Sequence, residues 1–189
     1  MNLRSIFVLA AVLVLCGVGT LHDLLEHPFY QAWSNGTLPV EALRSYAGEY
    51  GAFISGIGGG WQTLGRDDIA KHEAAHARIW NDTFAAALGT FVSDPNIEEV
   101  DHLVNTAKEL FQTPAGAMGA LYAFESQQPR TAASKLKGLT EHYQELPERC
   151  GRYFELHSGD YDEVSCLRES MATLNDPARA EALAACRRD

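Results

Sequence analysis

A single carboxylate, Glu125, lies in a stretch of the chain whose composition is otherwise typical of a buried helix. It is the only charged residue between Glu109 and Arg130, and the residues just before it are Ala, Gly, Met, Leu, Tyr and Phe. An unpaired carboxylate inside a protein costs considerable free energy. We therefore expect Glu125 to have a cation or a proton as its partner.

Residues of a second helix supply candidate partners. Glu73 and His76 form a Glu-x-x-His pair, which places a carboxylate and an imidazole on adjacent turns of one face, as in carboxylate-bridged dimetal bundles. His72 lies one turn before His76, so a His-x-x-x-His pair is the alternative. Either motif alone is weak evidence, because Glu and His side chains are more often solvated than bound to a metal.

A third group of candidates lies near the end of the chain. His157, Asp160 and Glu163 trace one drifting stripe on a helix, whereas Asp162 falls off that stripe and is interpreted as part of a solvated turn. Apolar neighbours predict that His157 is buried, with a hydrogen-bonded core histidine as the alternative. Carboxylates and imidazoles brought inward from several helices are the ligand set of a non-haem iron or manganese site.

Several tyrosines could line such a site. Tyr50, near the end of the helix expected over residues 37–55, could face inward together with Glu49. Tyr50, Tyr122 and Tyr161 are possible catalytic residues, although no pattern assigns any of them a role. Tyrosines in such positions more often pack a core or line a pocket than bind a metal.

Composition limits the classes of partner. The chain has 189 residues, 46% of them hydrophobic, and a formal charge of −10. This length suits one sizeable core. The 15 basic residues are scattered, which argues against a nucleic-acid surface and favours a small-molecule partner. Four cysteines without CxxC spacing indicate neither a zinc knot nor a disulfide scaffold.

The pattern downstream of residue 20 predicts one helix after another and no strand, hence an all-α, single-domain multi-helix bundle of seven or eight helices. Caps, prolines and glycines set the expected boundaries. The expected helices cover residues 37–55, ended by Gly56 and glycines 58–60; 67–88, capped by Asp67 or Asp68; 94–111; 114–128; 131–143; 147–171; and 176 to the terminus.

The amino terminus allows two interpretations. Arg4 followed by the apolar residues 6–19 resembles a secretion signal, and the alternative is an apolar first helix. Cleavage before Thr20 would leave only a turn or two before the Leu-Leu-Glu-His-Pro motif at Leu24. We therefore divide the chain into an apolar segment 1–19 and a helical domain 20–189, and we favour a cytoplasmic location over export.

Three segments carry a resemblance to a known superfamily. Leu24-Leu-Glu-His-Pro-Phe-Tyr-Gln-Ala-Trp33 and Leu43-Arg-Ser-Tyr-Ala-Gly-Glu-Tyr50 resemble the opening helices of haem-oxygenase-like proteins, which include thiaminase II and pyrroloquinoline-quinone synthase. Ala120-Leu-Tyr-Ala-Phe-Glu-Ser-Gln-Gln-Pro129, Lys135-x-x-Gly-Leu139 and Tyr153-Phe-Glu-Leu-His157 resemble the branch of chlamydial death-domain-associating proteins (CADD-like) and their bacterial relatives. This resemblance, over roughly residues 21–174, implies a haem-oxygenase-like fold and a dimetal oxidase or oxygenase that binds no haem.

Three ligands of that branch match by position, namely Glu125, His76 and His157. Three do not, because the early glutamate falls on Ile69 and the late aspartate and histidine fall on Tyr161 and Val164. We infer that Glu73 replaces the first, and that a shortening by one residue puts Asp160 and Glu163 in place of the other two. The expected metal ligands are thus Glu73, His76, Glu125, His157, Asp160 and Glu163.

Together these observations predict an iron-dependent oxidase or oxygenase that acts on a small organic metabolite, of the kind used in cofactor biosynthesis. The cofactor is expected to be one or two iron ions, with manganese as the alternative metal, and no haem. The expected partners are a small substrate and dioxygen, without nucleic acid or membrane, and a homodimer is one possible assembly. The alternative, favoured by the unmatched ligands, is a degenerate interaction or regulatory protein that kept the fold.

Overall fold

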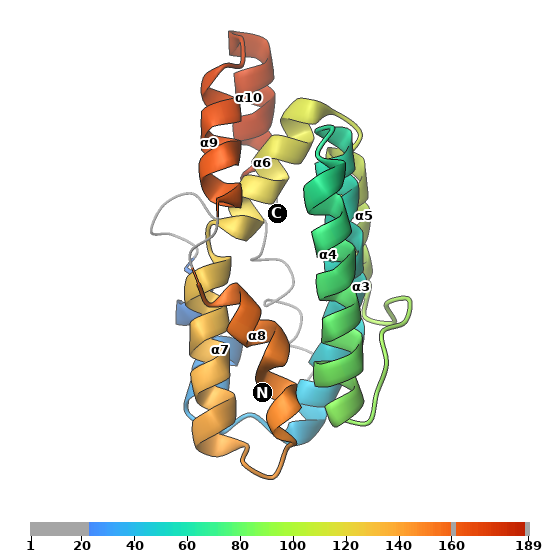
Figure 1. The fold of residues 1–189 in the computed structure, drawn as a ribbon, viewed down its shortest axis with the longest axis vertical. Coiled ribbons are helices and arrows are strands. Elements are labelled where there is room, and N and C mark those ends of the chain that lie inside the picture. Colours follow the sequence, from blue (N-terminus) through green and yellow to red (C-terminus); the bar gives the residue numbers. More distant parts are fainter. Residues whose placement is uncertain (1–22, 160–161, 188–189) are drawn as a thin grey trace.

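The computed structural model describes residues 23–159 and 162–187, and this part of the chain is helical without any strand (Figure 1). The elements are η1 (Leu24–Glu26), α2 (Pro28–Ser34), α3 (Val40–Thr63), α4 (Asp67–Ile79), η2 (Trp80–Ala85), α5 (Glu98–Leu110), α6 (Pro114–Glu125), α7 (Gln128–His142), η3 (Glu148–Gly151), α8 (Arg152–His157), α9 (Glu163–Ala172) and α10 (Asp176–Ala185). The all-α prediction is confirmed. The apolar segment 1–19, Asp160 and Tyr161 lie outside the described residues.

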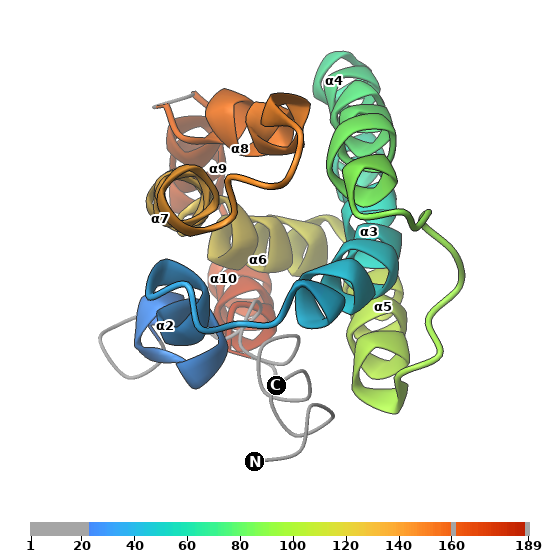
Figure 2. The same ribbon diagram turned by 90° about the horizontal axis from the view of Figure 1, so that it is seen from below.

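Helix α6, which carries Glu125, runs through the middle of the bundle. Figure 2 shows α3, α4 and α5 together on one side and α7 and α8 on the other, with α6 between them. Helices α9 and α10 both pack against α6. No helix in the described part of the chain combines the length and the apolar character needed to cross a bilayer. This arrangement brings the ends of α4, α6, α8 and α9 toward a shared interior.

A core of aromatic rings fixes α8 against the rest of the bundle. The indole of Trp33 stacks on Phe84, with 5.8 Å between the ring centroids, and Phe84 meets Phe154 of α8 edge to face at 5.0 Å. Trp80 likewise meets Tyr153 of α8 at 4.9 Å. Offset and edge-to-face ring pairs stabilise a core beyond the burial of their area. The last residue of α8, His157, is thereby held at the face of α4.

The prediction that α3 ends at its glycines is wrong. The helix continues to Thr63, and the glycines serve helix packing instead. A Cβ at Gly60 would lie 2.8 Å from the ring of Phe111, and one at Gly58 would lie 3.2 Å from the carbonyl oxygen of Ala70. Close approach of α4 and α5 to α3 therefore outweighs the low helix propensity of glycine.

The predicted start of α5 at Asp94 is also wrong, since the helix begins at Glu98. The Glu49 side chain on α3 explains the difference. One of its carboxylate oxygens accepts hydrogen bonds from the backbone amides of Asn96 and Ile97, at 2.9 and 3.2 Å. Glu49 thus anchors the amino-terminal end of α5, where a carboxylate is favourable.

The predicted long helix over residues 147–171 is broken into η3, α8 and α9. Its break follows His157 at Ser158 and Gly159, where glycine readily ends a helix. By contrast, the start of α6 is as predicted, because the Thr113 hydroxyl accepts a hydrogen bond from the amide of Gly116 and Pro114 occupies the first turn. Helix α4 begins at Asp67 as expected, but neither Asp67 nor Asp68 is its cap; Arg66 holds that position.

The contact between α6 and α10 yields a prediction. A Cβ at Gly119 would overlap the carbonyl oxygen of Ala182, which belongs to the backbone of α10 and cannot rotate away. We expect Gly119→Ala to lower the free energy of unfolding by about 1–3 kcal/mol, the usual cost of overpacking. Gly56→Ala is the control, since nothing lies within 4 Å of its added Cβ, and it should raise stability by up to ~1 kcal/mol. Urea titrations that gave the two variants equal stability would contradict this account of the α6–α10 contact.

Candidate metal centre

Helix α4 presents one carboxylate and one imidazole toward the interior. Glu73 is buried, His76 is half-buried, and Oε1 of Glu73 lies 3.2 Å from Nδ1 of His76. Their spacing of three residues puts both on one face of the helix. His72 is exposed. The pair that faces the interior is therefore Glu73 with His76, and not His72 with His76.

His157 approaches this pair from α8. Its ring centroid lies 4.5 Å from that of His76, and the ligand atoms of Glu73, His76 and His157 all lie within 4.8 Å of one another. Nδ1 of His157 is 2.8 Å from the carbonyl oxygen of Tyr153. Because a carbonyl can only accept, Nδ1 carries the proton and the lone pair is on Nε2. This is the arrangement that prepares a histidine to bind a metal.

Glu125 comes from the last turn of α6, with only 3% of its surface exposed. Within residues 23–159 and 162–187, its Oε1 has no hydrogen-bond partner. The indole of Trp61 lies beside the carboxylate and lowers its pKa somewhat, but without the geometry of a hydrogen bond, since Trp61 Nε1 is itself without a partner in the same part of the chain.

The net effect of its surroundings is to raise the pKa of Glu125 well above its ordinary value. Burial is the largest cause, followed by the negative charges of Glu73 and then Glu163. Three carboxylates from α4, α6 and α9 therefore act on one another in a poorly solvated interior. Glu163, half-buried at the start of α9, owes this position to the break after His157.

Two apolar residues stand where the resemblance would place ligands. Ile69 is buried in the core one turn before Glu73, and Val164 is half-buried on α9. Neither side chain can bind a metal. Glu73 and Glu163 lie close by in the chain, and the charges of both contribute to the raised pKa of Glu125. Asp160 and Tyr161, the other two positions of this comparison, are not described.

The candidate tyrosines have different surroundings. Tyr50 is buried and stacks on Tyr46, with 4.9 Å between the ring centroids. Its pKa is raised well above the ordinary value, mainly by burial and then by the charges of Tyr30, Tyr153 and Glu125. Tyr122 is half-buried on α6, and its hydroxyl accepts a hydrogen bond of 3.4 Å from Arg168 of α9. Tyr50 thus packs in the aromatic core within electrostatic reach of Glu125, whereas Tyr122 links two helices.

Sequence reasoning gave no role to Lys135, a buried lysine in a cage of aromatic rings. Only 5% of Lys135 is exposed, and its Nζ donates a hydrogen bond of 2.7 Å to the hydroxyl of Tyr46. Five rings lie within 5.0 to 5.8 Å of Nζ: Tyr30, Trp33, Tyr46, Tyr50 and Phe154. Burial lowers the pKa of Lys135 to about 7.

The chain did contain a signal for Lys135. The buried residues of α7 recur with helical spacing, and Lys135 falls in the middle of that stripe: Gln128, Thr131, Ala132, Lys135, Gly138 and Leu139. This stripe is mixed, since it includes Gln128 and Thr131, so the signal is weaker than the isolated charge that singled out Glu125. Among the described residues, no carboxylate forms an ion pair with its ammonium group.

The donor set fits an iron ion. Two imidazoles and buried carboxylates are nitrogen and oxygen ligands of the kind that non-haem iron prefers. The buried Oε1 of Glu125, without a donor in the described chain, would gain a partner, and the mutual repulsion of Glu73, Glu125 and Glu163 would be neutralised. The fold and this candidate site have the form of a helical-bundle metal protein of the carboxylate–histidine class.

Comparison with known proteins agrees with this class. The family described as "iron-containing redox enzyme" matches residues 61–180. Three similar curated proteins are each named 4-aminobenzoate synthase. That of Chlamydia pneumoniae is 29% identical over 80% of this chain and 76% of its own length. That of Chlamydia trachomatis serovar D is 30% identical over 80% of this chain and 73% of its own length. That of Nitrosomonas europaea is 30% identical over 71% of this chain and 66% of its own length. The chain belongs to this family of iron-containing redox enzymes.

The first prediction from the site concerns iron binding. Glu125→Ala should weaken iron binding at least ~100-fold, since even residues that only support metal ligands typically contribute about 10–100-fold. Iron content after loading and desalting measures the effect, and circular dichroism should show the helical signal unchanged. His102→Ala, an exposed histidine on α5, is the matched control and should bind iron as the unmodified protein does. Full iron content in Glu125→Ala would exclude it as a ligand.

The second prediction concerns Lys135 and pH. Its pKa of about 7 lies below the ordinary value of 10.5, so unfolding takes up a proton between these two values and stability rises as pH rises. The quantity of interest is the free energy of unfolding of the unmodified protein minus that of Lys135→Met. We expect this difference to increase by on the order of 4 kcal/mol in total between pH 7 and pH 10.5. Denaturant titrations at pH 7 and pH 9.5 measure the difference between the two proteins. A difference independent of pH would show that Lys135 is charged in the folded protein.

Proposed function

We propose that the protein is a non-haem iron oxidase or oxygenase whose metal is held by Glu73, His76, Glu125 and His157, with Glu163 and Asp160 as further ligands. The observation that carries this proposal is the buried Glu125 oxygen, which has no hydrogen-bond partner in the described chain and whose carboxyl group feels the charge of Glu73, a member of the cluster with His76 and His157. This number of ligands can coordinate one or two metal ions, and manganese binds the same types of donor. Bound iron supplies the one-electron chemistry that lets dioxygen react with organic molecules.

The character of the ligands supports ionic iron over haem. Glu73 and Glu125 are anionic oxygen donors, whereas haem iron is held mainly by one or two axial side chains. The interior beside the cluster is filled by fully buried rings, including Trp80, Phe84 and Phe154. A large planar cofactor would have to displace this core.

The residues around the cluster prepare it for such chemistry. The ring of Tyr153 stacks on His157, with 4.0 Å between centroids, which holds the imidazole in place and keeps water from that face. The carbonyl of Tyr153 fixes the proton on Nδ1. Burial lowers the pKa of Lys135 to about 7, and its Nζ donates a hydrogen bond to the hydroxyl of Tyr46, so this lysine is a candidate proton donor or acceptor in the interior.

The names of the similar proteins suggest a product. Since relatives that cover most of this chain are named 4-aminobenzoate synthase, we propose that this protein also forms 4-aminobenzoate or a close aromatic amine. Its substrate is then a small organic precursor, and dioxygen is the oxidant. A cytoplasmic location suits this role, because reduced iron and small precursors are available there.

A degenerate protein that kept the fold for interaction or regulation is the second candidate. The apolar Ile69 and Val164, at positions where the resembling enzymes have ligands, favour it. Retention of a buried glutamate with raised pKa opposes it, because a metal-free protein gains nothing from this cost.

Two measurements test the proposal together. The protein, loaded with ferrous ion without air, should consume dioxygen in an oxygen electrode, and His76→Ala should reduce this uptake by at least tenfold because the variant lacks an iron ligand. Expression of the chain should also restore growth to bacteria that need added 4-aminobenzoate. An interaction protein would do neither. Oxygen uptake without restored growth would keep the oxidase and reject the product.

A further inference from the structure

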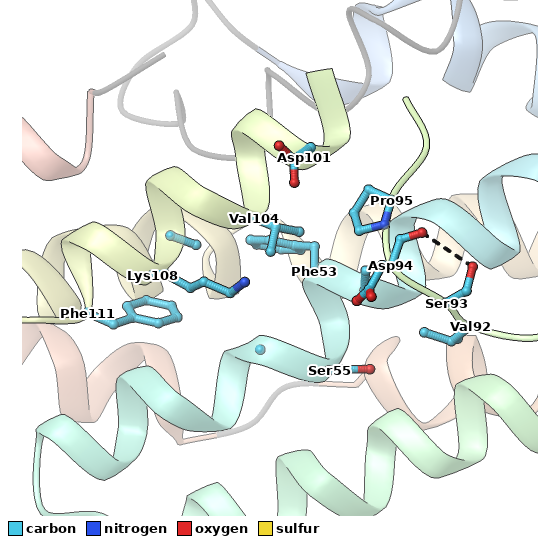
Figure 3. A pocket seen from close by; sticks show the side chains of 13 residues that line it. Phe53, Ser55, Val92, Ser93, Asp94, Pro95, Asp101, Val104, Lys108 and Phe111 are labelled. Carbon is cyan, nitrogen blue, oxygen red and sulfur yellow. Dashed lines mark hydrogen bonds between the residues drawn. The ribbon is translucent and has the colours of Figure 1, made fainter. Parts of the chain in front are cut away.

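A cavity of about 930 Å³ opens between α3, α5 and the loop that precedes α5 (Figure 3). Its volume is within the ~300–1,000 Å³ typical of small-molecule sites. Buried side chains of Phe53, Val104 and Phe111 form an apolar floor, and polar residues form the rim. None of the five predicted metal ligands that the structure describes lines it, so the cavity is separate from that cluster.

The rim carries three charged side chains, all exposed: Lys108, Asp94 and Asp101, of which Asp101 accepts a hydrogen bond from Asn105. Figure 3 shows the Lys108 amine and the Asp94 carboxylate directed toward the space between them, Lys108 from α5 and Asp94 from the loop. In the described part of the chain neither side chain takes part in an ion pair or a hydrogen bond, although other lysines and aspartates do. The hydroxyl of Ser55 instead bonds back to the carbonyl of Gly51. Lys108 and Asp94 are therefore available to a ligand that has an anionic end and a donor end.

Gly56 indicates that the cavity is kept open. It lines the cavity from the middle of α3, and an added Cβ would meet no atom within 4 Å. Its φ angle is not in the left-handed region, so neither packing nor backbone conformation requires glycine here. Glycine nevertheless lowers helix stability relative to alanine. Because Gly56 lines the cavity, we expect a large side chain at this position to occupy part of that space.

The floor of the cavity contacts the wall of the metal centre. The ring of Phe53 meets Phe124 edge to face, with 5.3 Å between centroids, and Phe124 directly precedes Glu125. On its other side Phe53 contacts Tyr50 at 5.4 Å. A ligand in the cavity would therefore lie one layer of rings away from the end of α6.

From these observations we infer that the cavity is a second small-molecule site, which binds an aromatic carboxylate carrying an amino group at its far end. Lys108 pairs with the carboxylate, Asp94 accepts hydrogen bonds from the amino group, and Phe53 and Phe111 pack on the ring. This ligand class follows from the cavity alone. The choice of 4-aminobenzoate as the probe rests on the proposed function.

Calorimetric titration with 4-aminobenzoate tests the site on the full chain, once freed of iron by chelation and once loaded. We expect saturable binding of one molecule in both forms. Lys108→Ala should weaken it about tenfold, the effect of losing one hydrogen bond to a charged group. Asp94→Ala should weaken it less, and Gly56→Leu should abolish it by filling the space. Lys137→Ala, an exposed lysine on α7, is the control and should bind as the unmodified protein does.

Each contrary result has a distinct meaning. Absence of binding, or unchanged binding in both Lys108→Ala and Gly56→Leu, would overturn the site. Binding that survives Lys108→Ala but is lost in Glu125→Ala would place the probe at the metal centre and also overturn it. If Gly56→Leu does not fold, the surface variants Lys108→Ala and Asp94→Ala decide alone. Binding at the cavity by a protein that consumes no dioxygen would reject the proposed function and keep the site.

Discussion

Burial of the Glu125 carboxylate is the constraint on which the rest of the centre depends. Helix α6 carries this group into the middle of the bundle, where Oε1 has no donor in the described chain and where Glu73 and Glu163 add like charge. Taking a carboxylate out of water costs several kcal/mol unless a cation or proton compensates. Glu73, one of the two carboxylates that act on Glu125, lies in a cluster with the imidazoles of His76 and His157, and such a mixed donor set favours a metal cation over a shared proton.

Lys135 is a second buried ionisable group, and aromatic rings enclose its ammonium group. Burial favours the neutral form of both groups, so Glu125 tends to keep its proton and Lys135 tends to lose its own. The charge of Lys135 also acts on the candidate ligand His157. The pKa of His157 is lowered by burial, by His76 and, to a smaller extent, by Lys135. The Tyr50 ring, 5.6 Å from Nζ of Lys135, also feels the charge of Glu125. Two groups that favour their neutral forms thus lie in the same interior as the candidate metal ligands.

The fold class and much of the centre follow from local sequence signals. An isolated charge identified Glu125, spacing of three residues paired Glu73 with His76, and Thr113-Pro114 marked the start of α6. The remainder depended on contacts between distant residues. Helix α3 continues through its glycines because α4 and α5 pack there, and Glu49 anchors α5 from another helix. The aromatic cage of Lys135 draws its rings from α2, α3 and α8, which no single segment reveals.

The most direct measurement of the central claim is a crystal structure of the iron-loaded protein with data collected at the iron absorption edge. Anomalous scattering locates iron without assuming its ligands. The account predicts an anomalous peak within bonding distance of Oε1 of Glu125 and Nε2 of His157, with Glu73 and His76 completing the contacts. A peak elsewhere in the molecule, or a Glu125 carboxylate paired with a donor other than iron, would contradict it.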